Sequence, residues 1–106
     1  MEALQFRFDG GEAAKANAGP AIVGVVASGN LEVLIEAATG TSCAIEVNTA
    51  AHGFGKTWEA VMRDFFERHR VGGIRVSIND AGATPAIVSL RLDQAIEEFT
   101  RPADER

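Results

Sequence analysis

The sequence predicts an α+β domain with two layers, a mixed sheet of four or five strands with two helices on one face. Several short runs are rich in β-branched residues or alternate apolar and polar residues, and two longer segments have helical periodicity. Each predicted helix carries one apolar stripe, so it covers a sheet from one side only. A chain of 106 residues with 46% hydrophobic and 24% charged residues suits a single domain with one core.

Five segments have strand patterns, namely residues 4–8, 22–26, 31–35, 44–48 and 74–78. Residues 27–30 separate the second and third segments and include Gly29 and Asn30. Because glycine accepts the positive φ of a tight turn, these two residues predict a two-residue hairpin turn.

The first helix is predicted to begin near Thr57 and to end at Gly72-Gly73, since glycine is favoured just after a helix. Its apolar stripe consists of Trp58, Val61, Met62 and Phe65. The second helix begins with Thr84 as a cap followed by Pro85, and it continues to about residue 99. The strand, helix and strand from residue 43 to 79 predict two parallel strands.

The remaining segments and the composition limit the function. The whole chain, residues 1–106, is expected to form one domain, with 9–20 as a mobile Gly-rich loop and 101–106 as a frayed tail. One cysteine excludes an internal disulfide and suits the reducing cytoplasm. No apolar stretch approaches the ~20 residues of a membrane span, and the net charge of −5 argues against a nucleic-acid partner.

A search for catalytic or metal-binding residues gives no candidate cluster. Lys56 and Thr57 end a Gly-Lys-Thr run like that of a phosphate-binding loop, but Ala50 stands where the full pattern needs glycine. His52 and His69 have no partner at metal-ligand spacing. We therefore expect no metal site and no catalytic residue, and Glu97 and Glu98 are interpreted as a solvated helix face.

Ser28 is the one candidate site residue. It lies at the predicted hairpin tip beside Gly29, which has no side chain to hinder an approaching enzyme. A hydroxyl held this way suits modification by another protein, which would supply the activating base.

Three blocks carry a family resemblance: residues 24–34 (GVVASGNLEVL), the Gly53-Phe54-Gly55 turn with Trp58, and residues 79–85 (NDAGATP). Together they resemble the delta subunit of malonate decarboxylase, an acyl carrier protein related more distantly to the carrier subunit of citrate lyase. The resemblance extends over most of the chain, from residue 21 to 99. Asn30 stands where an acidic residue would be expected.

The resemblance implies a non-catalytic carrier. In that family, a serine matching Ser28 carries a 2'-(5''-phosphoribosyl)-3'-dephospho-coenzyme A arm through a phosphodiester bond, with Gly29 beside it. The terminal thiol would hold acetyl and malonyl groups as thioesters. The implied partners are the acyltransferase and decarboxylase subunits, a malonyl transferase and a prosthetic-group transferase.

Three alternatives to a malonate decarboxylase carrier remain at this point. The first is a small interaction or regulatory domain in which Ser28 is only a turn residue. The second is a citrate lyase-type carrier, and the third is a phosphate-binding enzyme that uses Lys56 and Thr57. A further hypothesis is that backbone amides from Gly82 to the helix start at Thr84 receive a phosphate of the arm.

Overall fold

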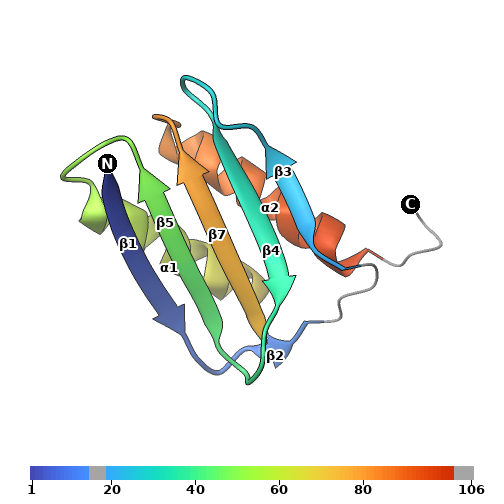
Figure 1. The fold of residues 1–106 in the computed structure, drawn as a ribbon. Coiled ribbons are helices and arrows are strands. Elements are labelled where there is room, and N and C mark those ends of the chain that lie inside the picture. The colour runs from blue at the N-terminus through green and yellow to red at the C-terminus, as the bar shows by residue number, and fades with distance from the viewer. Residues whose placement is uncertain (15–18, 102–106) are drawn as a thin grey trace.

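The computed structural model describes residues 1–14 and 19–101, which form a five-stranded mixed sheet, a two-stranded sheet and two helices (Figure 1). In chain order, the elements are β1 (Glu2–Phe8), β2 (Glu12–Ala13), β3 (Ala21–Gly24), β4 (Leu31–Ala37), β5 (Cys43–Thr49), α1 (Gly55–His69), β6 (Val71–Gly72), β7 (Ile74–Asp80) and α2 (Pro85–Thr100). The predicted α+β architecture is confirmed.

The large sheet has the strand order β1-β5-β7-β4-β3, with β7 at its centre. β5 and β7 run parallel, as predicted, and the other neighbours are antiparallel. In the register, Thr49 of β5 and Leu31 of β4 both pair with Asp80, the last residue of β7. The β3–β4, β5–α1 and β7–α2 connections therefore meet at one end of the sheet (Figure 1), which we call the Asp80 end.

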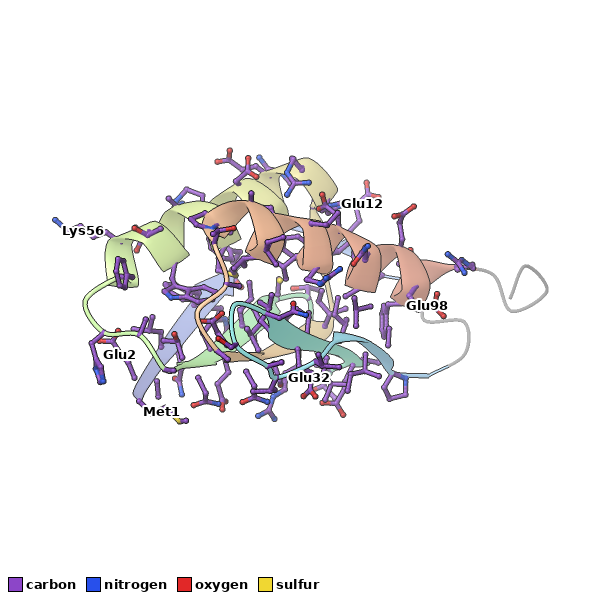
Figure 2. All side chains as sticks on the ribbon, turned by 90° about the horizontal axis from the view of Figure 1, so that it is seen from above. Met1, Glu2, Glu12, Glu32, Lys56 and Glu98 are labelled. Carbon is purple, nitrogen blue, oxygen red and sulfur yellow. The ribbon has the colours of Figure 1, made fainter. Side chains whose placement is uncertain are left out.

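The core lies between the sheet and the two helices. Strands β4, β5 and β7 bury every second residue, because successive side chains of a strand point to opposite faces. The largest fully buried side chains include Phe65, Phe99, Leu31, Ile35, Ile45, Met62, Ile74 and Leu92. Figure 2 shows both helices on one face, while Glu32 lies on the opposite face of the sheet. The prediction that both helices cover one face is thus confirmed.

The end of α1 differs from the prediction. Gly72 and Gly73 do not terminate the helix; Arg70 does so in the left-handed conformation, with φ of 49°. Gly72 instead lies in β6, where a Cβ would collide with the carbonyl oxygen of Thr41. Glycine is needed there for close packing of two backbones, which a sequence pattern does not distinguish from a helix end.

The segment predicted as a loop from residue 9 to 20 contains β2, which pairs in parallel with β6. The backbone amides of Glu12 and Ala14 donate hydrogen bonds to the carbonyl groups of Arg70 and Gly72. These bonds attach the segment to the chain that follows α1. Residues 15–18 of the predicted loop and 102–106 of the predicted tail lie outside the described residues. Within the described ranges, no helix has the length and apolar character needed to cross a bilayer.

Candidate functional site

Ser28 lies in the connection between β3 and β4, residues 25–30, which we call the Ser28 loop. Ser28 and Gly29 are exposed, as the sequence predicts. The predicted two-residue turn is wrong, however, because the last pair of the ladder is Gly24 with Glu32 and six residues separate the strands. Val25 and Val26 leave the sheet and are more than half exposed.

Gly24 explains why the strand ends early. Its φ is +85°, and a Cβ at this position would collide with the carbonyl oxygen of Leu31. The chain therefore leaves the ladder at a residue that only glycine can occupy without strain. The glycine that shapes this hairpin is thus Gly24, whereas at Gly29, also at positive φ, an added Cβ would point into open space.

Backbone hydrogen bonds hold the Ser28 loop in place. The Gly29 amide donates to the carbonyl of Ala81 at 2.9 Å, and the Ala81 amide donates to the carbonyl of Asn30 at 3.0 Å. The Asn30 amide closes a turn onto Ala27 at 2.8 Å. These bonds flank Ser28 on both sides and connect its loop to the β7–α2 connection.

Asn30 also fixes the loop through its side chain. Its Oδ1 accepts from the amide of Leu31 at 2.9 Å and from Nε of Arg91, on α2, at 3.3 Å. An acidic side chain at this position, as expected from the resemblance, would accept from the same two donors.

Asp80 organises the neighbouring connection and is 6% exposed. Its carboxylate accepts from Oγ1 of Thr49 at 2.8 Å, from the Gly82 amide at 3.1 Å and from the Ala83 amide at 2.9 Å. Its backbone carbonyl accepts from the Ala50 amide at 3.1 Å. Asp80 thereby links the end of β5 to the connection on which the Ser28 loop rests.

These bonds argue against the hypothesis that an arm phosphate binds at the start of α2. The amides of Gly82 and Ala83 already donate to the Asp80 carboxylate, and a phosphate placed there would meet that acidic group. The hydroxyl of Thr84 accepts from the Ile87 amide, so the predicted cap is confirmed.

A cavity of about 290 Å³ opens at the Asp80 end of the sheet, between the first turns of the two helices. Its lining is mainly apolar and comprises Ala51, Phe54, Thr57, Trp58, Val61, Asp80, Gly82, Ala83, Pro85 and Val88. Neither the role of Asp80 nor this cavity is among the predictions from the sequence. An aspartate at a strand end followed by Ala-Gly is nevertheless a sequence signal for a carboxylate that binds its own turn.

The structure does not bring the other sequence candidates together. Lys56 is exposed in the first turn of α1 and points away from the molecule (Figure 2). Nε2 of His52 lies 3.2 Å from the N-terminal amine of Met1. Nε2 of His69 lies 2.9 Å from Oδ1 of Asp93 on α2. Across residues 1–14 and 19–101, no three metal-ligating side chains gather at one point.

The hydroxyl of Ser28 makes no hydrogen bond to any of the described residues. No base of the described chain therefore activates it. The arrangement presents an exposed oxygen on a loop fixed by its backbone, which suits attack on a group supplied by another protein.

Comparisons with known proteins agree with this geometry. A family model described as "ACP: Malonate decarboxylase delta subunit (MdcD)" matches residues 18–99. A malonate decarboxylase acyl carrier protein of Burkholderia cepacia is 62% identical over 98 residues, covering 92% of this chain and 90% of that protein. The corresponding protein of Xanthomonas campestris pv. campestris (strain B100) is 57% identical, covering 92% and 93%.

A solved structure is also similar. One chain in the crystal structure of a Pseudomonas malonate decarboxylase hetero-tetramer in complex with malonate superposes with a TM-score of 0.82 at 37% identity. The match covers 93% of this chain and 99% of that one.

A small α+β domain with one exposed serine on a firmly held loop, and with relatives that carry acyl groups, is a carrier domain. Carriers of this kind are non-catalytic subunits. The chain belongs to the family of malonate decarboxylase acyl carrier proteins, the delta subunits of that enzyme.

Proposed function

We propose that Ser28 carries a 2'-(5''-phosphoribosyl)-3'-dephospho-coenzyme A arm through a phosphodiester bond, with Gly29 leaving the approach open. The observation that supports this proposal is the exposed Ser28 hydroxyl, on a loop that Gly29 and Asn30 attach to Ala81. The site fits the group because a Cβ added at Gly29 would meet no atom within 4 Å, so bulk can pass beside the serine.

The attachment reaction requires a transferase. The Ser28 oxygen bonds to the α-phosphorus of an arm donor that carries a 5''-triphosphate, the bond from this phosphorus to the bridging anhydride oxygen breaks, and diphosphate leaves. The serine proton passes to a base of the transferase, since no described residue of this chain makes a hydrogen bond to the hydroxyl. This chain contributes the position of the nucleophile and an unobstructed approach.

When bound, the arm supplies a terminal thiol that holds acetyl and malonyl groups as thioesters for other subunits. The partners we propose are the acyltransferase and decarboxylase subunits, a malonyl transferase and the prosthetic-group transferase, in the cytoplasm. The similar chain from a malonate decarboxylase hetero-tetramer supports such an assembly. A flexible tether holds its end at an effective concentration on the order of mM for each partner site.

Intact mass measurement of the chain isolated from its native cells tests the attachment. We expect one adduct with the mass of the phosphoribosyl-dephospho-coenzyme A arm. Ser28→Ala removes the adduct without loss of stability, because the side chain is exposed and unbonded. The matched control Ser89→Ala, on α2, keeps the adduct.

Thiol counting on the folded protein provides a second readout. Cys43 is fully buried, and burial raises the pKa of its thiol to about 12, so it does not react in the native state. Since the chain has one cysteine, the carrier form with its arm deacylated should titrate one thiol and Ser28→Ala none. An unmodified chain in cells that degrade malonate would instead indicate an interaction domain.

A further inference from the structure

The cavity at the Asp80 end lies next to the Ser28 loop. Gly29, which follows Ser28, is bound to Ala81 by a hydrogen bond of 2.9 Å, and Gly82 and Ala83 line the cavity. Ser28 is next to Gly29 in the chain, and Ala81 is next to the cavity-lining Gly82. The hydrogen bond between Gly29 and Ala81 therefore places Ser28 close to the cavity wall. An arm anchored at Ser28 is long enough to fold back onto this surface.

The size and lining of the cavity define the chemistry that it accepts. Its volume of about 290 Å³ lies just below the ~300–1,000 Å³ that small-molecule sites occupy. Phe54, Trp58 and Val88 make most of its wall apolar, with Asp80 as the acidic member. A short uncharged group fits this wall, whereas a carboxylate would lose its hydration and meet Asp80.

We infer that this cavity binds the acetyl thioester end of the arm and excludes the malonyl thioester. The inference rests on the attachment proposed above. Burial of the uncharged acetyl group against Trp58 and Val88 removes apolar surface from water. The malonyl group carries a free carboxylate and therefore stays in solvent, where a decarboxylating partner reaches it.

Trp58 makes the cavity observable, because it is the chain's single tryptophan, is 5% exposed and lines the cavity. The experiment compares ¹⁵N-labelled full-length protein without the arm and with the arm in thiol, acetyl and malonyl forms, each confirmed by intact mass. We expect the acetyl form to shift the Trp58 indole signal and the Ala83 and Val88 amide signals. The malonyl form leaves these signals where the unmodified chain has them.

Two substitutions of equal size separate the cavity from the helix surface. Ala83→Leu adds bulk inside the cavity, so it should abolish the acetyl-dependent shifts while the adduct mass remains. Ala86→Leu adds the same bulk at an exposed position of α2 and should keep the shifts. Hydrolysis of the acetyl thioester should be several-fold faster in Ala83→Leu than in Ala86→Leu.

The outcomes distinguish this inference from the attachment itself. An adduct with identical spectra in the unmodified, acetyl and malonyl forms overturns the cavity site and leaves the attachment intact. Equal shifts for acetyl and malonyl forms overturn the exclusion of the charged group. Absence of any adduct overturns the attachment and, with it, the cavity site.

Discussion

Asp80 is the residue on which the geometry around the Ser28 loop depends. Its side chain accepts hydrogen bonds from the last residue of β5 and from the β7–α2 connection. The residue after it exchanges backbone hydrogen bonds with Gly29 and Asn30. The position of Ser28 is therefore set by main-chain bonds and by a carboxylate outside its own loop. Substitutions within the Ser28 loop that keep its backbone shape would leave the serine where it is.

Replacement of Asp80 by alanine should lower the free energy of unfolding by about 1–3 kcal/mol, because buried donors lose their acceptor. Hydrogen exchange at the Gly29 amide should accelerate as well, since its acceptor Ala81 is no longer held. Urea unfolding and exchange rates measure the two effects. Asp64→Ala, at an exposed i, i+4 ion pair on α1, should cost under about 0.5 kcal/mol. Equal losses in both variants would refute the special role of Asp80.

At the scale of single residues, the sequence predicts the exposed hydroxyl of Ser28 but not the contacts that hold its loop in place. Ser28 and Gly29 can be recognised from turn composition and from the family pattern. The contacts of Asp80 with Thr49 and of Arg91 with Asn30 join residues 31 and 61 positions apart. Only the three-dimensional register of the strands brings such residues together, so local patterns do not reveal them.

Among the elements, α1 and α2 are joined at one point by a charged cluster of Arg68, His69 and Asp93. Asp93 Oδ1 lies 2.6 Å from Nη1 of Arg68 and 2.9 Å from Nε2 of His69. Burial alone would raise the pKa of Asp93. Hydrogen bonds from His69 and Arg68, together with their charges, outweigh burial and lower this pKa below its ordinary value of 3.8.

The direction of this shift determines a pH dependence. A carboxyl with a lower pKa in the folded state stabilises the fold above the unfolded pKa, and that contribution is lost as the pH falls through the folded value. Asp93→Asn should therefore lower the free energy of unfolding by about 0.5 kcal/mol at pH 7, since the side chain is 38% exposed. The difference in free energy of unfolding between Asp93→Asn and the wild type should become smaller below about pH 4. Unfolding in urea at pH 7 and pH 3 measures it.

Glu97→Gln is the control for that pH series, because Glu97 is exposed on the same helix and makes no ion pair among the described residues. Its unfolding curve should follow the wild type at both pH values. A difference for Asp93→Asn that stays constant from pH 7 to pH 3 would contradict the titration of Asp93.

Element types follow from the sequence better than element ends. The apolar stripes predict both helices, and alternation or a run of β-branched residues predicts each of the five strands of the large sheet. The end of β3 at Gly24 depends on the close approach of the Leu31 carbonyl group, and the end of α1 at Arg70 depends on local packing. The β2–β6 pair is too short to show periodicity. A glycine that is needed because a second backbone passes close to it cannot be distinguished by local sequence from a glycine that ends a helix.

The whole molecule combines a rigid sheet with the exposed Ser28 loop. β7 lies between β5 and β4, and its inward side chains Val76 and Ile78 are fully buried. Amides of β7 should therefore exchange with solvent only through global unfolding, whereas amides 26–28 should exchange orders of magnitude faster. Hydrogen exchange followed by NMR tests this contrast. Slow exchange throughout the Ser28 loop would contradict the open approach to the serine.

The burial of Cys43 has a consequence for the lifetime of a loaded carrier. Acyl groups on thioesters migrate readily to any accessible thiolate, and a surface cysteine would intercept the cargo within the same molecule. The polypeptide has one sulfhydryl, sealed in the core and held protonated by its surroundings. On the arm proposed for Ser28, transfer of the acyl group to this sulfur is thereby prevented, and the proposed thioester persists until a partner subunit removes the acyl group.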